Sequence, residues 1–128
     1  MREKRLANWQ SISDSRASNI TRERRIGAGE EAVEQDVFVR LHAREGEERS
    51  VEQVLRDVLG PSREEPGCLS FHLFRSMRDR RLFYIHSRWR DAAAFKMHAE
   101  LPHTVRFLER VDALLDQPRD VARTELIA

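Results

Sequence analysis

Proton transfer near neutral pH is the chemistry for which this 128-residue chain is best equipped, because it carries five histidines. Imidazole titrates near neutrality and can take a proton from a phenol. His103 follows Pro102 and so falls in the first turn of a predicted helix, where the positive end of the helix dipole favours the neutral imidazole that a general base requires. We therefore rank His103 first and His98 second as candidate catalytic residues. The structural alternative for both is a hydrogen bond at a helix kink.

Trp89 is the third candidate, because it ends a predicted strand beside the start of a helix. A buried indole N–H needs a hydrogen-bond partner, and the flat ring can hold an aromatic substrate. Packing in the core is the competing interpretation. The other three histidines share one strand face, where hydrogen bonding at an interface would explain them: His42, His72 and His86.

The spacing of potential ligands argues against a metal site. No pair of histidines or carboxylates stands four residues apart on a predicted helix with a third ligand in view, and His98 and His103 are not expected to share a face across a proline. Cys68 is the single cysteine, which excludes an internal disulfide and fits a reducing compartment. Nothing near it in the sequence would activate a thiolate, so we expect Cys68 to pack rather than react.

Three motifs follow one another along the chain: Glu-Pro-Gly-Cys at 65–68, Ser-Arg-Trp-Arg-Asp at 87–91, and His98 followed by Leu-Pro-His at 101–103. In this order they resemble the antibiotic biosynthesis monooxygenase (ABM) family of small dimeric oxygenases, whose typical run is E-P-G-C, two strands, R-W-x-D, a helix and A-H-x-x-S-P-H. The resemblance extends over about residues 36–127. It departs from the family at Leu101, where a serine usually caps the second helical segment.

The resemblance implies a quinol-monooxygenase-like enzyme that works without a cofactor. Such an enzyme removes a proton from a small aromatic quinol or polyphenol, and the resulting anion reduces dioxygen directly. His98 and His103 match the two histidines of the family's helix motif. Heme degradation, another activity of the family, is not expected, because Val39 and Leu108 stand where that branch has an asparagine and a histidine. The alternative function is a non-catalytic dimeric binding or sensor protein for a small hydrophobic metabolite.

The elements that must position these residues follow from hydrophobic periodicity, and their order, βαββαβ, predicts an α+β ferredoxin-like fold with a four-stranded antiparallel sheet. Ser50 and Gln53 form a potential capping box, Gly60-Pro61 is a helix stop, and Asp91 is placed to cap the second helix. The predicted elements are a strand at 36–44, a helix at 50–59, a hairpin of strands at 69–75 and 82–89, a helix at 92–100 continued from Pro102 to about 115, and a strand at 121–127.

The two faces of this sheet have different predicted partners. One face carries Phe38, Phe74, Leu82 and Tyr84 among polar residues and is costly to leave in water, so a second copy of the chain is its natural cover. In the resembled family two sheets pack in this way into a dimeric α+β barrel, with the pocket between each sheet and its helices. The predicted pocket residues are Val39, Leu41, Phe71, Leu73, Phe83, Ile85, Ser87 and Phe107.

Composition predicts one domain at 36–128, preceded by an arm at 1–35 that is flexible or docks on a partner subunit. Lys and Arg total 23 against 22 Asp and Glu, so a net charge of +1 gives no overall field that favours nucleic acid or a membrane. We interpret the basic run around Arg22, Arg24 and Arg25 as a solvated one rather than a nucleic-acid site. No apolar run has the length of a signal peptide core or a membrane span, so a cytoplasmic protein is expected.

Overall fold

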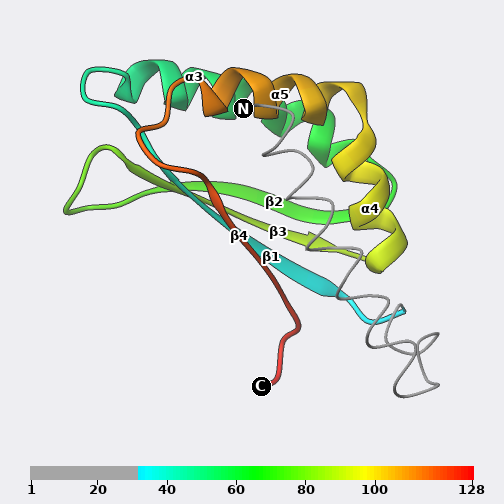
Figure 1. Cartoon of the computed structure of the whole chain (residues 1–128). Coiled ribbons are helices and arrows are strands. Elements are labelled where there is room, and N and C mark those ends of the chain that lie inside the picture. Colours follow the sequence, from blue (N-terminus) through cyan, green and yellow to red (C-terminus); the bar gives the residue numbers. More distant parts are fainter. Residues whose placement is uncertain (1–31) are drawn as a thin grey trace.

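The computed structural model describes residues 32–128, so most of the predicted arm at 1–35 lies outside the described residues (Figure 1). Within them, no helix is long and apolar enough to cross a membrane. The elements, in chain order, are β1 (Gln35–His42), α3 (Glu48–Arg63), β2 (Cys68–Arg75), β3 (Leu82–Trp89), α4 (Ala92–Glu100), α5 (Pro102–Asp112) and β4 (Asp120–Thr124).

The four strands form one antiparallel sheet in the order β2-β3-β1-β4, and the helices cover one of its faces (Figure 1). This arrangement confirms the predicted ferredoxin-like fold. It also confirms which side of β1, β2 and β3 is buried, since successive side chains of a strand point to opposite faces. The helix-facing residues of the strands form the core together with Phe95, Phe107, Leu108 and the apolar side of α3. These strand residues are Val37, Val39, Leu41, Phe71, Leu73, Phe83, Ile85 and Trp89, and all of them are buried except Leu73, which is partly exposed.

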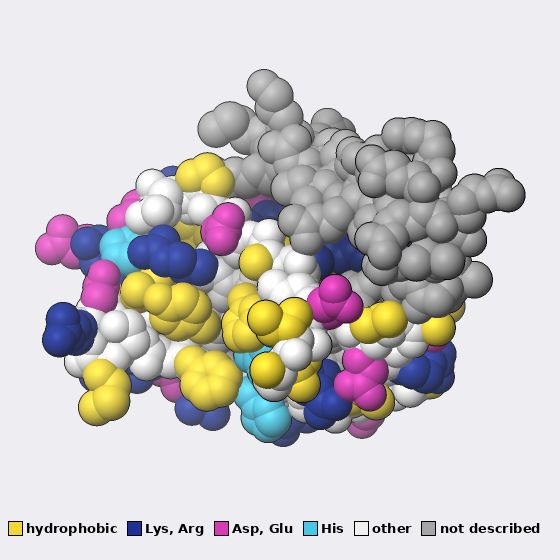
Figure 2. Space-filling view, turned by 90° about the horizontal axis from the view of Figure 1, so that it is seen from below, with side chains coloured by type: hydrophobic (Ala, Val, Ile, Leu, Met, Phe, Trp, Pro, Cys, Tyr) yellow, Lys and Arg dark blue, Asp and Glu magenta, His cyan; other side chains and the backbone are white. Residues whose placement is uncertain are grey.

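The opposite face of the sheet has no covering element among the described residues and carries large apolar side chains. Phe38 is 46% exposed and Phe74 is 53% exposed. Phe38 stacks on the ring of His86 with 4.7 Å between centroids, and His86 Nε2 lies 2.8 Å from Asp36 Oδ1. Figure 2, which views the molecule from below, shows hydrophobic side chains gathered there beside histidines. An apolar patch of this kind is a feature of interaction surfaces.

The first helix differs from its prediction at both ends. The predicted stop at Gly60-Pro61 is wrong, because α3 continues to Arg63 with Pro61 inside it. Gly60 does not adopt the left-handed conformation that ends helices, and the extra turn buries Ser62 in the core. The predicted capping box is also wrong: the N-cap is Glu47, whose side chain makes no capping hydrogen bond.

The second helical region is interrupted just before Pro102, where the sequence predicted that a new helical segment begins. Asp91 Oδ1 accepts a hydrogen bond from the Ala94 N–H at 2.8 Å, which confirms the predicted cap of α4. Leu101 is extended, with φ −71° and ψ 147°, and Pro102 begins α5. A residue before proline is pushed out of the helical region, so α4 and α5 are separate helices joined at one residue. The last elements are shorter than expected, because α5 ends at Asp112 and β4 at Thr124.

His42 ties three parts of the fold together at the end of β1. Its Nε2 lies 2.8 Å from Asp79 Oδ2 in the β2–β3 turn, and its Nδ1 lies 2.8 Å from Asp116 Oδ1 after α5. Both nitrogens donate at once only in the charged imidazolium. The two carboxylates, Asp116 first, therefore raise the pKa of His42 above its ordinary value of 6.5.

We expect the contacts of His42 with Asp79 and Asp116 to stabilise the folded protein at low pH and to lose this effect as the pH rises. Because the pKa of His42 is raised in the folded state, its contribution is complete below 6.5 and is lost as pH rises through the folded pKa. Urea unfolding of the wild type and His42→Gln should therefore differ most near about pH 6 and least near about pH 9. A difference that stays constant or grows with pH would contradict this assignment.

Candidate functional site

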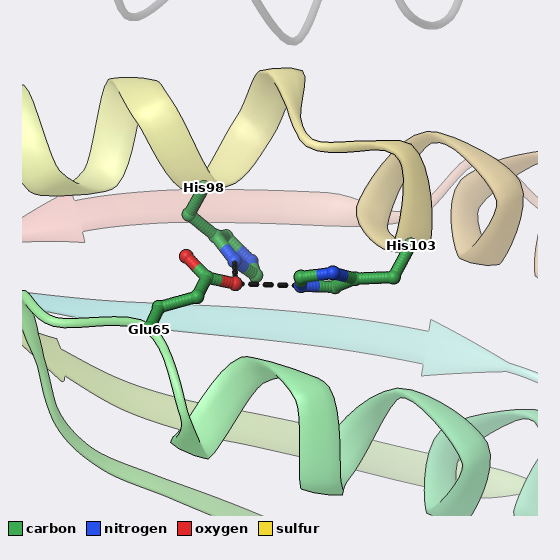
Figure 3. A group of neighbouring side chains, drawn as sticks. All are labelled: Glu65, His98 and His103. Atoms are coloured by element: carbon green, nitrogen blue, oxygen red, sulfur yellow. Dashed lines mark hydrogen bonds and ion pairs between the residues drawn. The ribbon is translucent and has the colours of Figure 1, made fainter.

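Glu65, His98 and His103 meet in one cluster, with the carboxylate between the two imidazoles (Figure 3). Glu65 Oε2 lies 2.8 Å from His98 Nδ1 and 2.6 Å from His103 Nε2. The side chains of Glu65 and His98 are 8% and 7% exposed, whereas that of His103 is 24% exposed. His103 is therefore the member of the cluster that a molecule from outside can reach.

The break between α4 and α5 brings the two histidines together. His98 lies in the last turn of α4 and His103 in the first turn of α5, with extended Leu101 between them. We expected His98 and His103 not to share a face across Pro102, with no third ligand in view; in the structure both contact Glu65. The change of direction at Leu101 lets both rings point at the same carboxylate oxygen (Figure 3).

Glu65 reaches the cluster because the loop between α3 and β2 packs closely on α4. Gly67 in this loop lies so near α4 that a Cβ atom on it would be 2.3 Å from the Cβ of Ala94. The Arg90 N–H donates to the Gly67 carbonyl at 2.9 Å and fixes the approach. The glycine of the Glu-Pro-Gly-Cys motif thus permits the contact, and its glutamate makes it.

The hydrogen bonds define where the protons lie when both imidazoles are neutral. A carboxylate only accepts, so His98 donates from Nδ1 and His103 donates from Nε2. The lone pair of His103 is then on Nδ1. Thr104 Oγ1, buried beside the cluster, lies 3.3 Å from His98 Nδ1 and is a second polar neighbour of that nitrogen.

Aromatic rings hold His98 on its other sides. The ring of Trp89 lies 4.4 Å from that of His98, and Phe71 and Phe95 lie at 6.0 and 6.1 Å between centroids. Trp89 is fully buried, and its indole N–H donates to Ser87 Oγ at 2.9 Å. The polar requirement of the tryptophan is met inside the protein, and its ring packs against the candidate site.

A small cavity of about 20 Å³ lies between the sheet and the helices, next to His98. A volume of this size holds about one water molecule, and an aromatic ring needs far more. A ring could enter only if α4 and α5 moved away from the sheet. The cavity is lined by Val37, Val39, Val58, Phe71, Ile85, Ser87, Phe95, His98, Thr104, Phe107 and Leu108.

The structure brings together only part of the predicted pocket. Five of its predicted residues line the cavity: Val39, Phe71, Ile85, Ser87 and Phe107. Leu41 is buried elsewhere in the core, and Leu73 and Phe83 border a second hollow of about 320 Å³ between α3 and β2. Trp89 and His103 do not line the cavity. Sequence reasoning missed Glu65, whose signal was its place at the head of the Glu-Pro-Gly-Cys motif, and it missed Thr104.

Comparisons with known proteins agree on one family. The family model described as "Antibiotic biosynthesis monooxygenase" (ABM) matches residues 37–110. "Putative monooxygenase YcnE" of Bacillus subtilis is 38% identical over 65 residues, which cover 51% of this chain and 68% of that protein. Protein sll1783 of Synechocystis sp. is 33% identical over 61 residues, which cover 48% of this chain and 42% of that protein, so the match spans less than half of this relative.

Solved structures show the same fold over most of the described residues. The crystal structure of PA3566 from Pseudomonas aeruginosa has a TM-score of 0.71 and 31% identity, over 77% of this chain and 98% of that one. The structure of Rv0793 from Mycobacterium tuberculosis has a TM-score of 0.71 at 24% identity, over 74% of this chain and 96% of that one, and supports the fold alone.

The thiol of Cys68, which follows the motif glutamate by three residues, is held in its protonated form. Burial, and next the charge of Glu65, raise the pKa of Cys68 to about 11. The thiol donates to the Ser70 carbonyl at 3.6 Å. These surroundings favour the packing role that the sequence predicted.

We expect Cys68 to react slowly with iodoacetamide at pH 8, because a pKa of about 11 leaves only about one thiol in a thousand ionised. Glu65→Gln should speed the reaction, since it removes the negative charge that opposes the thiolate. The rate of alkylation followed by mass spectrometry measures both effects, with the unfolded chain as the reference. Alkylation of the folded protein as fast as that of the unfolded chain would overturn the assignment.

Proposed function

Because the chain belongs to the antibiotic biosynthesis monooxygenase family, we propose that it is a cofactor-independent monooxygenase that oxidises a small aromatic quinol or polyphenol with dioxygen. The observation that carries this proposal is the contact of His103 with Glu65. A partly exposed imidazole held by a buried carboxylate is the arrangement of a general base that an orienting carboxylate supports.

Glu65 gives His103 a defined orientation and tautomer. By accepting the Nε2 proton it leaves the lone pair on Nδ1, and its charge stabilises the imidazolium that forms when Nδ1 takes a proton from a phenol. His98 donates to the same oxygen and keeps the carboxylate in place. His103 is the proposed catalytic base, and Glu65 and His98 are positioning residues.

The reaction then proceeds on the substrate. The phenolate passes one electron to dioxygen, and the two radicals combine to form a carbon–oxygen bond and a hydroperoxide. Loss of water from the hydroperoxide, with the proton on His103 returned to the leaving oxygen, gives the oxidised product, so that a hydroquinone and one dioxygen yield a hydroxyquinone and one water.

The size of the cavity bears on where the two substrates sit. About 20 Å³ beside His98 suits a diatomic molecule and excludes an aromatic ring. We therefore place the ring of the substrate at the exposed side of His103, and we expect the cavity to enlarge only through movement of α4 and α5. If a small hydrophobic ligand enlarged the cavity and bound there but was not oxidised, the alternative function of a binding or sensor protein would be favoured.

The open face of the sheet supports the proposal of a homodimer. Phe38 and Phe74 are about half exposed, and burying them against the same residues of a second copy would remove an apolar patch from water. A two-fold contact through this face is self-complementary, as closed dimers require.

Oxygen uptake tests the enzyme. Protein treated with a chelator, assayed in a dioxygen electrode with a panel of hydroquinones and polyphenols, should consume dioxygen above the rate of autoxidation, and His103→Ala should reduce this rate by about 10²- to 10⁴-fold. Lys96→Ala, on the exposed side of α4, is the matched control and should leave the rate unchanged. Uptake that persists in His103→Ala would refute the assigned base, and no uptake with any substrate of the panel would refute the oxygenase.

Light scattering coupled to size exclusion tests the dimer. The wild type should have twice the mass of the chain at micromolar concentration, and Phe74→Asp should shift it to the monomer, because a carboxylate would be buried without a partner. Met77→Asp is the control, since Met77 lies in the β2–β3 turn and is 99% exposed. A monomeric wild type, or a dimer unaffected by Phe74→Asp, would contradict the proposed interface.

A further inference from the structure

The cluster of Glu65, His98 and His103 has the composition of a transition-metal site. We propose that it binds one divalent ion of the Zn²⁺ class, with His98 Nδ1, His103 Nε2 and a Glu65 carboxylate oxygen as ligands. These ligand atoms lie within 4.8 Å of one another, so a single ion can reach all three. Two imidazoles and one carboxylate are a ligand set suited to Zn²⁺, Co²⁺ and Fe²⁺.

The distances in the cluster are close to those that an ion requires. At the tetrahedral angle, bonds of about 2.0–2.2 Å separate neighbouring ligand atoms by about 3.3–3.6 Å. Glu65 Oε2 is now 2.6 and 2.8 Å from the two nitrogens, so replacing two protons by an ion needs the carboxylate oxygen to withdraw by roughly 0.5–1 Å. Glu65 lies in the loop between α3 and β2, outside any helix or strand, and can make this shift.

The surroundings leave an entry path and room for further ligands. Glu65 and His98 are buried, whereas the side chain of His103 is 24% exposed, so an ion would enter from the side of His103. Three protein ligands leave a fourth position of a tetrahedral ion open to water or to the hydroxyl of Thr104, which is 3.3 Å from His98 Nδ1.

An ion in this cluster would switch off the proposed base. A neutral imidazole bound to an ion through Nε2 carries its proton on Nδ1, the nitrogen that would otherwise accept the proton of the substrate. The ion therefore converts His103 from an acceptor into a donor. This consequence rests on the proposed function, whereas the binding itself does not.

Other histidines define the control. His72 faces His86 across β2 and β3, and His86 contacts Asp36, so this pair is the main competing place for an ion. His42 presents its two nitrogens to different carboxylates and cannot place both on one ion. Residues 1–31 contain neither histidine nor cysteine.

Titration of the chelator-treated, tag-free protein with Zn²⁺ in a calorimeter, and with Co²⁺ under visible absorption, tests the site. One ion per chain should bind, with Co²⁺ bands of a low-symmetry site. Glu65→Gln and His103→Gln should each weaken binding of the ion by at least roughly 10- to 100-fold, because loss of a residue that only hydrogen-bonds a metal ligand already costs this much. The double variant His72→Gln/His86→Gln should bind as the wild type does, and circular dichroism checks that each variant folds.

The outcomes separate this inference from the proposed function. Stoichiometric binding that Glu65→Gln and His103→Gln abolish supports the site whether or not any quinol is oxidised. Equal binding by the wild type and His103→Gln, or loss of binding in His72→Gln/His86→Gln instead, overturns it even in an active oxygenase. If oxidation is found, Zn²⁺ should inhibit it and a chelator should restore it; uptake unchanged by a bound ion would overturn the switch.

Discussion

The contact of one carboxylate with two histidines is the interaction on which the candidate site depends. Glu65 joins the loop after α3 to the end of α4 and the start of α5, across separations of 33 and 38 residues in the sequence. A buried carboxylate is costly unless it is paired, so the cluster holds its three elements in one arrangement. The close packing of Gly67 on Ala94 makes this possible, because any side chain at that position would push the loop and its carboxylate away from the helix.

The sheet serves the site by dividing the protein into two chemically different sides. Its helix-facing side is a closed apolar core, which isolates His98 among aromatic rings and leaves a cavity of about 20 Å³. Its other side carries Phe38 and Phe74 exposed beside histidines. The first side explains how His98 and the carboxylate that orients His103 are kept from water, and the second explains why a second copy of the chain is the proposed neighbour.

The same two nitrogens that hold protons in the cluster are those that would hold an ion, and the two states exclude each other. When His98 Nδ1 and His103 Nε2 carry protons, the Glu65 carboxylate accepts their hydrogen bonds and His103 has a free lone pair on Nδ1. When an ion is bound, all three side chains are its ligands. Whether the cluster acts as a base or as a metal site therefore depends on whether the two histidine nitrogens carry protons or bind an ion. The exposed edge of His103 is the route for either a substrate or an ion.

Local sequence patterns determined much of this protein. Alternation along Val37, Val39 and Leu41 and along Phe83 and Ile85 gave the strands and their buried sides, and Asp91 and Pro102 gave two helix starts, because periodicity and capping depend on residues a few positions apart. The end of α3 was missed, since the helix continues through Gly60 and Pro61 to Arg63, whose Nε donates to the Phe71 carbonyl of β2, a tertiary contact that the local Gly-Pro pattern does not encode. Only the tertiary structure decided that Glu65 meets His98 and His103. That contact depends on how a loop packs against a broken helix, and no spacing in the sequence encodes the direction in which the chain turns at Leu101.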